Sequence, residues 1–478
     1  MLKHSRESRF HEQVAPYPDD RIRGVVGVHY TQRPLTHGKR VITVMINHAA
    51  NRSGEPIDWR TKGLPHGALD IALPDIPAKS WNVLREDLPL PLAVLRVSAL
   101  TRNRQWMREF LARTGAKLAP HGKTYMSPQV FQWQLEDGAW AITLATVHQV
   151  RIARGAGINR LLLANEIVGA RDIEYVLDEL RRHPSFELFC LVDSVAGVNR
   201  LAQAARRAPV GRPLPLLVEV GYRGGRTGCR ETNEVRAVCD AVRDARPHLD
   251  LAGVEGFEGL HGYLSARESV PKVRHFLNLI VQTAEWLDRE GFFDRDGIIL
   301  SAGGSAYYDL VAEVFAQARL SKKTCVVLRS GCYFTHDAGW YERLFSEVLE
   351  RSSVAKAIGH RFENALEVWT YVLSVPEPCR AILGAGRRDF GHDAGPPTPL
   401  RRYRPGATEA PDMLTGEFQI AVINDQHAHM TLPPQADIQV GDMIALGVSH
   451  PCTTFDKWQL LYLVNERYDI ESAIQTYF

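Results

Sequence analysis

Eight short apolar segments recur between residues 117 and 328, and each is followed by a polar turn and a stretch with helical periodicity. Near-continuous apolar runs of this length are typical of parallel strands that are buried on both faces. Eight strand–helix units over about 215 residues favour a closed (β/α)8 barrel, with a doubly wound sheet as the alternative. The predicted strands are Lys117–Ala119, Ala141–Ala145, Leu161–Ala164, Leu188–Val192, Leu216–Val220, Val254–Leu260, Ile298–Leu300 and Cys325–Leu328.

Polar residues of unusual type follow the carboxyl ends of these predicted strands. Barrel enzymes build their active sites at that end of the barrel. The positions therefore favour the barrel over the doubly wound sheet. The residues are Lys123, Asn165, Asp193, Arg226, His261, Ser305 and Tyr333.

The rest of the chain follows other patterns. Residues 1–55 fit no period and are treated as an N-terminal extension of unknown role. Ala93–Leu100 predicts a strand, and Asn103 is placed to cap a following helix in which Trp106 and Phe110 share one face. After about residue 345, alternation of apolar and polar positions predicts an antiparallel β domain. Within it, Arg401–Pro411 predicts an exposed loop because it is rich in Pro, Gly and charge.

Composition excludes several classes of protein. The chain has 478 residues, 45% of them hydrophobic and 23% charged, as in an ordinary soluble globular protein. Its 57 Lys and Arg residues against 55 Asp and Glu leave a net charge of +2, so no polybasic field for nucleic acid is expected. Neither a secretion signal nor an apolar run long enough for a membrane is visible. Seven cysteines without a CxxC pair indicate reduced thiols and a cytoplasmic protein.

The first candidate for chemistry is Lys123, which follows the first predicted barrel strand. From position alone, a lysine on a plain surface loop is the alternative. If its side chain points into the barrel mouth, desolvation and neighbouring cations favour the neutral amine that forms imines or abstracts protons. His121, two residues earlier, would then lie on the same side as Lys123.

Two glycine-rich turns follow the last two predicted strands. They contain Gly303, Gly304 and Ser305, and then Gly331 and Tyr333. Backbone amides freed by glycine can cradle a phosphate, and the loops after strands seven and eight are the usual phosphate site of a barrel. Ordinary tight turns are the alternative for each.

Two further patterns carry candidate ligands. Arg226 lies in a glycine-rich turn after the predicted strand at Leu216–Val220, where a permanent positive charge can hold a carboxylate or an electron-poor ring, although a salt-bridged surface arginine is as plausible. His450 and Cys452 would project to one face of an extended chain, and imidazole with thiolate suits Zn²⁺. A buried cysteine beside a structural histidine is the alternative there.

Six strings in sequence order resemble those of the fold-type III pyridoxal-phosphate proteins related to D-serine dehydratase and D-threonine aldolase. The resemblance covers about residue 56 to the end of the chain. One departure is Tyr125 and Met126, where relatives often have His and Lys. The strings are PHGKTYMSP from 120, GAWAITLAT from 138, LLLANEIVG from 161, SAGGSAYYDL from 301, GAGRRDFGHDAG from 384 and SHPCTTFDKW from 449.

This resemblance implies an α/β fold with an alanine-racemase-like (β/α)8 TIM barrel and a C-terminal antiparallel β domain. It implies a β domain of residues 56–100 and 346–478 and a pyridoxal-phosphate-binding barrel of residues 101–345. Lys123 would hold pyridoxal 5'-phosphate as a Schiff base and remove the Cα proton of a D-amino acid. Gly304, Ser305, Gly331 and Tyr333 would surround the phosphate.

The resemblance also implies that Arg226 and His261 lie near the cofactor ring, that His450 and Cys452 bind zinc, and that the protein is a homodimer. The expected function is a dehydratase, or deaminase, of D-serine-like β-hydroxy amino acids that gives a 2-oxo acid and ammonia. Cysteine rather than a carboxylate at position 452 favours this reaction. The alternatives are a metal-dependent D-threonine aldolase and a non-catalytic pyridoxal-phosphate-binding protein.

Overall fold

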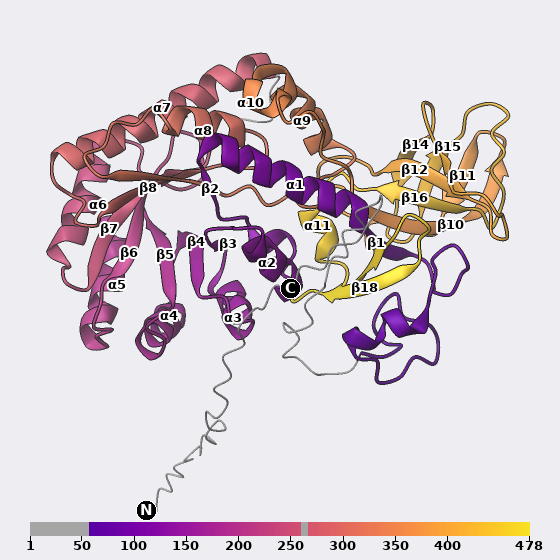
Figure 1. Ribbon diagram of the computed structural model, residues 1–478, viewed down its shortest axis with the longest axis horizontal. Helices are drawn as coiled ribbons and strands as arrows, with labels where there is room; N and C mark the ends of the chain where they lie inside the picture. The colour runs from indigo at the N-terminus through magenta and orange to yellow at the C-terminus, as the bar shows by residue number, and fades with distance from the viewer. Residues whose placement is uncertain (1–56, 260–265) are drawn as a thin grey trace, which may run out of the picture. The chain divides into compact units, whose positions relative to one another are not determined.

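The computed structural model describes residues 57–259 and 266–478 (Figure 1). Its first sheet has eight parallel strands in the order β2-β9-β8-β7-β6-β5-β4-β3. The circle closes between β2 and β3, where Trp140 N donates to Leu118 O at 2.7 Å and Thr143 N donates to Pro120 O at 2.9 Å. The strands are β2 (Lys117–Leu118), β3 (Ile142–Leu144), β4 (Arg160–Glu166), β5 (Glu187–Val192), β6 (Leu214–Val220), β7 (Leu249–Gly256), β8 (Gly297–Ala302) and β9 (Lys323–Leu328).

A helix follows each barrel strand. In α4 the residues at positions 173, 176, 177 and 180 are buried, the spacing of one apolar helix face packed on a barrel. The helices are α2 (Pro128–Glu136), α3 (Val147–Gly155), α4 (Ala170–Arg182), α5 (Val195–Arg207), α6 (Thr232–Asp244), α7 (Ala266–Arg289), α8 (Tyr308–Phe315) and α9 (Trp340–Arg351), with the short α10 (Ser353–Lys356) after α9.

The predicted barrel is confirmed, and each of the eight predicted strands overlaps an observed one. The largest offset is in β7, which begins five residues before the prediction and ends at Gly256. Small and medium apolar side chains such as Ala119, Leu162 and Val327 fill the barrel interior. The filled interior leaves the ends of the strands as the place for a site.

The second sheet has ten strands, with the main order β13-β12-β16-β10-β1-β17-β18 and a branch formed by β11, β15 and β14. It confirms the predicted antiparallel C-terminal sheet, although β1 and β17 are parallel. The strands are β1 (Leu92–Arg96), β10 (Leu366–Glu377), β11 (Arg380–Leu383), β12 (Thr398–Tyr403), β13 (Asp412–Met413), β14 (Gln419–Ile423), β15 (Ala428–Thr431), β16 (Met443–Gly447), β17 (Leu460–Val464) and β18 (Ile470–Gln475).

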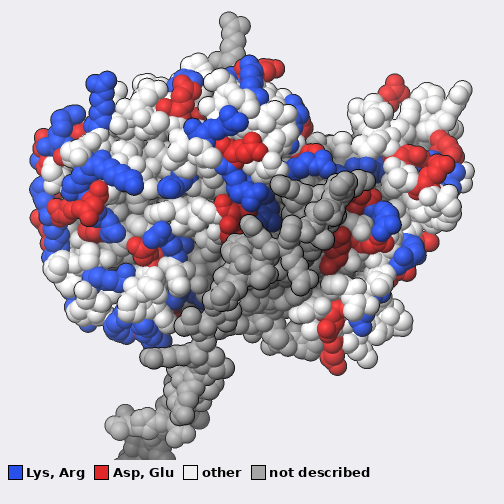
Figure 2. All heavy atoms as spheres, in the orientation of Figure 1, with Lys and Arg blue, Asp and Glu red and all other residues white. Residues whose placement is uncertain are grey.

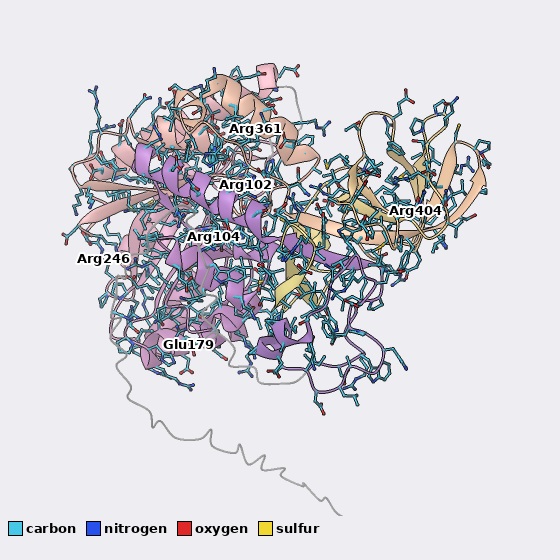
Figure 3. The ribbon with its side chains drawn as sticks, turned by 45° about the vertical axis from the view of Figure 1, so that its right-hand side comes forward. Arg102, Arg104, Glu179, Arg246, Arg361 and Arg404 are labelled. Atoms are coloured by element: carbon cyan, nitrogen blue, oxygen red, sulfur yellow. The ribbon has the colours of Figure 1, made fainter. Side chains whose placement is uncertain are left out.

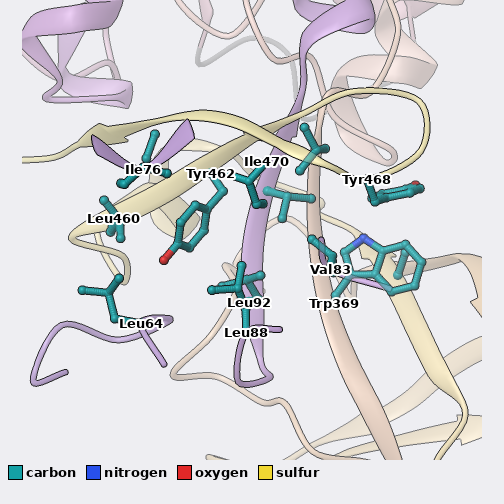
Figure 4. Packing of buried hydrophobic residues seen from close by; sticks show 14 of the residues in the cluster. Leu64, Ile76, Val83, Leu88, Leu92, Trp369, Leu460, Tyr462, Tyr468 and Ile470 are labelled. Atoms are coloured by element: carbon teal, nitrogen blue, oxygen red, sulfur yellow. The ribbon is translucent and has the colours of Figure 1, made fainter. Parts of the chain in front are cut away.

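An apolar cluster packs the segment before β1 onto this sheet (Figure 4). Leu64, Ile76 and Val83 lie against Trp369 of β10 and Tyr462 of β17. Residues close to the two ends of the described part of the chain therefore share one core. The proposed domain limits at residues 55, 100 and 345 remain predictions, and residues 1–55 lie outside the described part.

Some local predictions need correction. The loop predicted at 401–411 is confirmed from residue 404 onward, but Arg401 and Arg402 lie in β12 and pair with β13 and β16. Asn103 does not cap a helix, because α1 (Val97–Thr114) begins directly after β1. Asn103 is instead buried in mid-helix, where its side chain donates to Phe334 O and Glu363 O and accepts from Glu363 N. Trp106 and Phe110 do share a face and stack at 5.4 Å.

Charged side chains of both signs are interspersed over the visible face of the molecule (Figure 2). Many form ion pairs: Arg102 and Arg104 of α1, which Figure 3 labels, pair with Glu363 and Asp137. Among the described residues, no helix is both long and apolar enough to cross a membrane.

Candidate active site

A cavity of about 500 Å³ lies at the carboxyl ends of the barrel strands. Its wall combines turns that follow the barrel strands with residues 450, 452 and 453 from the segment between β16 and β17. The volume is within the range of small-molecule and cofactor sites. Five predicted groups meet here: the Lys123 turn, Arg226, the two glycine turns and the His450–Cys452 pair.

Lys123 lies on a short 3-10 turn, Gly122–Thr124, directly after the first barrel strand. Both Lys123 and His121 line the cavity. The Nδ1 atom of His121 is buried and has no hydrogen-bond partner among the described residues. Burial, with the positive charges of Lys123 and Arg329, holds the pKa of His121 well below its usual value. The imidazole beside the lysine is therefore neutral.

Four charged residues that sequence reasoning missed reach the barrel mouth: Glu166, Glu219, Glu255 and Arg329. The Arg329 guanidinium lies 2.6 Å from Glu255, and both side chains are buried. Burial raises the pKa of Glu255 to about 8 although Arg329 opposes the shift. The available signal was a charged residue inside an otherwise apolar strand, as in LLVEV, AGVEG and VVLRS.

The glycine turns line the cavity, but two of their amides have a different partner from the predicted phosphate. Gly303 N and Gly304 N donate to the carboxylate of Glu258 at 2.9 and 2.7 Å. Glu258 is fully buried, and burial raises its pKa. The turn thus binds a carboxyl side chain of the protein, in the place where a phosphate was predicted. Ser305 and Gly331 also face the cavity, and Ser305 Oγ accepts from Cys332 N at 3.2 Å.

The remaining predicted cofactor residues have different outcomes. Arg226 lines the cavity and its guanidinium lies 5.0 Å from the ring centre of Phe257. His261 lies outside the described residues. The Tyr333 side chain does not line the cavity and is buried beside Phe334 and Phe362. Tyr333 is therefore near the second glycine turn only through its backbone.

His450 and Cys452 both line the cavity, although not in an extended segment. Pro451 begins a helical turn, and Cys452 is the first residue of α11 (Cys452–Phe455). The expected strand geometry is therefore wrong. Hydrogen bonding from Cys332, and then from His450, holds the pKa of the Cys452 thiol well below its usual value despite burial. Burial lowers the pKa of His450, but Cys452 and Asp393 outweigh it and raise the pKa to about 9.

Asp393 supports this pair and was missed by sequence reasoning. Its carboxylate lies 2.6 Å from His450 Nδ1 and accepts from Thr453 Oγ1 at 2.6 Å. Since Nδ1 is engaged, Nε2 is the ring nitrogen left for a thiolate or a metal. A histidine oriented by a carboxylate is the usual arrangement of a metal ligand. The signal was the string GHDAG, which the resemblance contained without a role for Asp393.

Packing explains why two distant strings meet here. Gly391 N donates to Thr454 Oγ1 at 2.9 Å, and Trp458 Nε1 donates to Asp389 O at 2.8 Å. A Cβ atom at Gly391 would lie 2.2 Å from Thr453 Oγ1, so only glycine allows this approach. The segment 384–395 thus holds the turn that carries His450 and Cys452.

These groups fit both expected cofactors. A cavity of this size with Lys123 and Arg226 at its wall and an orphaned imidazole nitrogen suits pyridoxal phosphate. A thiolate, an imidazole and its orienting carboxylate suit a soft divalent metal such as Zn²⁺.

The closed barrel, with Lys123 and two glycine turns at the carboxyl ends of its strands, is typical of an alanine-racemase-like protein. The alanine racemase N-terminal domain family matches residues 95–319, and the serine dehydratase domain family matches residues 365–464. The two domain matches and the relatives described next support the fold-type III pyridoxal-phosphate-dependent family that includes D-serine dehydratase and D-threonine aldolase.

The relatives cover most of the chain. D-threonine aldolase of an Arthrobacter species is 27% identical over 397 residues, which are 83% of this chain and 94% of that protein. The crystal structure of D-threonine aldolase from Filomicrobium marinum has a TM-score of 0.69 at 20% identity and covers 84% of this chain and 98% of that chain. D-threo-3-hydroxyaspartate dehydratase from Delftia has a TM-score of 0.65 at 21% identity and covers 83% of this chain and 99% of that chain.

Proposed function

We propose that the protein is a pyridoxal-phosphate- and zinc-dependent dehydratase of D-β-hydroxy amino acids of the D-serine type. The observation that carries the proposal is the His450–Cys452 pair on the wall of the cavity that contains Lys123. One cavity then offers an amine for the α-position of a substrate and a metal site for its β-hydroxyl. The D configuration rests on the names of the relatives, which are all enzymes of D-amino acids.

Each cofactor has its own contribution. Pyridoxal phosphate supplies an electron sink for the charge that develops at Cα. Zinc supplies a Lewis acid for the departure of a poor leaving group. His450 and Cys452 would hold the metal, and Lys123 would hold pyridoxal phosphate, with the phosphate against Ser305 and Gly331.

The side chains of the protein divide the remaining work. Lys123 would hold the cofactor and, as a free amine, would remove the Cα proton of the substrate from its D face. His121 stays neutral beside Lys123, so it adds no positive charge that would oppose a protonated lysine. Asp393 fixes the His450 ring, and Glu258 holds the first glycine turn. Loss of the Cα proton and the β-hydroxyl leaves an enamine, which water converts to a 2-oxo acid and ammonia.

A retro-aldol reaction is the second candidate, favoured by the similarity to D-threonine aldolase over 83% of the chain. It needs a base that deprotonates the β-hydroxyl, whereas elimination needs the hydroxyl to leave. A metal site with a thiolate in place of a carboxylate favours elimination in our proposal. We further propose a cytoplasmic homodimer, on the grounds of cysteine usage and family resemblance.

A product assay distinguishes these functions. The purified protein is incubated with the D and L forms of serine, threonine and 3-hydroxyaspartate, and ammonia, 2-oxo acid, aldehyde and glycine are measured. The proposal expects equal ammonia and 2-oxo acid from D isomers alone. Aldehyde with glycine would establish the aldolase instead. Bound pyridoxal phosphate without any turnover would indicate a binding protein.

Metal removal is a second test of the same proposal. Dialysis against EDTA is expected to abolish turnover, while the absorbance of the bound pyridoxal phosphate stays, and Zn²⁺ is expected to restore activity. Cys452→Ala should reproduce the effect of EDTA. Full activity in a preparation shown to contain no metal would contradict the proposed role of zinc.

A further inference from the structure

A second cysteine lies beside the proposed metal pair. The Sγ atom of Cys332 is 3.6 Å from the Sγ atom of Cys452, although the two residues are 120 positions apart in the chain. Cys332 follows β9 in the second glycine turn, is 4% exposed and lines the same cavity. Neither the sequence pattern nor the family resemblance assigned it a role.

The distance between the two sulfur atoms fits a shared ion. A Zn–S bond of about 2.3 Å and a tetrahedral angle place two thiolates of one ion about 3.8 Å apart. A disulfide needs about 2.05 Å instead. Without an ion, this separation is that of a hydrogen bond between the two sulfur atoms, and a metal bound to both would take the place of the shared proton.

The number of ligands supports the same conclusion. Catalytic zinc sites usually have three protein ligands and one open position. His450 and Cys452 provide two. Asp393 is engaged with His450 Nδ1 and Thr453, as an orienting group is. Cys332 is therefore the side chain that can serve as the third protein ligand.

We propose that Cys332 is the third protein ligand of the metal, which is held by His450, Cys452 and Cys332 with one position open. The proposal rests on the proposed metal site and extends it. Two thiolates make the site soft, so Zn²⁺ is favoured over Mg²⁺ or Mn²⁺. Thr124 Oγ1, 3.1 Å from Cys452 Sγ, and Ser305 Oγ, bound to Cys332 N, hold the two cysteines in place.

X-ray absorption at the zinc edge tests this assignment without an activity measurement. The zinc-loaded wild-type enzyme is expected to show two sulfur neighbours at about 2.3 Å, and Cys332→Ser only one. Zinc affinity, measured by competition with a chromophoric chelator, should fall by more than tenfold in Cys332→Ser. Cys325→Ser and Cys379→Ser, which change cysteines outside the cavity, are the matched controls and should behave as wild type.

The outcomes separate this proposal from the one on which it rests. One sulfur neighbour in both the wild type and Cys332→Ser would overturn the role of Cys332 and leave the His450–Cys452 site intact. Zinc that is not retained by the wild type at all would overturn the metal site itself. If Cys332→Ser fails to fold, Cys332→Asp keeps an anionic ligand, and it is expected to bind zinc with one sulfur neighbour.

Discussion

At the scale of single residues, a cluster of three carboxylates reaches the cavity wall through Glu219. Possible ligand atoms of Glu166, Asp193 and Glu219 all lie within 4.8 Å of one another. Burial, with Glu219 beside it, raises the pKa of Glu166 to about 9. At neutral pH this side chain is therefore protonated, which avoids two adjacent buried negative charges.

The raised pKa predicts how stability depends on pH. The pKa of Glu166 is higher in the folded protein than its ordinary value near 4.5. Its contribution to the free energy of unfolding is therefore fully present below pH 4.5 and is lost as pH rises through about 9. Glu166→Gln keeps a neutral side chain at every pH. The free energy of unfolding of each protein is measured by urea denaturation at pH 5 to 9. It should fall less steeply with pH for Glu166→Gln than for the wild type, and the two slopes should differ by up to about 1.4 kcal/mol per pH unit.

Glu174→Gln is the matched control for this experiment, because Glu174 lies on the exposed surface of α4. It should give the pH profile of the wild type. Parallel profiles for the wild type and Glu166→Gln would show that Glu166 is ionised in the folded protein at neutral pH.

The sequence allowed several residues of the site to be predicted from their type, but not the contacts that such residues make. Lys123, Arg226 and His450 were found because each is an unusual side chain at an expected position. Glu258 and Asp393 were missed because their roles depend on contacts with segments 45 and 57 residues away. Their partners become known only when the barrel and the second sheet have formed.

At the scale of elements, the turn after β9 approaches the turn after β2. A Cβ atom on Gly331 would lie 2.6 Å from the backbone oxygen of His121. Tyr125 OH also donates to Gly331 O at 2.7 Å. The glycine is therefore required for contact between the two turns that carry the proposed phosphate and lysine sites.

Gly331→Ala tests this contact. Forcing a methyl group into it should cost about 1–3 kcal/mol in the free energy of unfolding and weaken pyridoxal phosphate binding, measured by absorbance titration. Gly155→Ala is the control, since a Cβ atom there meets nothing within 4 Å. Equal stability and cofactor affinity in the two variants would show that the turns can move apart freely.

The short helix α11 shows where local pattern was insufficient. The sequence around Pro451 is compatible with an extended chain or a helical turn. The observed turn is fixed by contacts with Gly391 and by the indole of Trp458 on Asp389 O. Tertiary contacts determine such four-residue segments more than propensity does.

At the scale of the whole molecule, the repeating strand–helix pattern made the barrel predictable, because each unit carries its own local signal. The order of the ten-stranded sheet was not predictable in this way. In that sheet β1 lies between β10 and β17, which are more than 260 residues away in the chain. Such pairings depend on the closure of long loops and leave no local pattern.

Asn103 connects the barrel to the segment that enters this sheet. Its side chain donates to Phe334 O after β9 and exchanges hydrogen bonds with the backbone of Glu363 before β10. Asn103→Ala leaves these buried backbone groups without their partner and should lower the free energy of unfolding by at least about 1–3 kcal/mol.

Asn278→Ala is the control for this measurement, because Asn278 is exposed on α7 and binds only the local Arg274 O. Its denaturant midpoint should remain within error of the wild type. A similarly small effect of Asn103→Ala would contradict the connecting role of Asn103.

We propose above all that this cavity is a pyridoxal-phosphate site in which Lys123 holds the cofactor. The most direct measurement is reduction of the purified holoenzyme with borohydride, followed by proteolysis and mass spectrometry. A pyridoxyl group is expected on the peptide that contains Lys123, and none is expected in Lys123→Ala. A pyridoxyl group on another lysine, such as Lys62, would contradict this assignment.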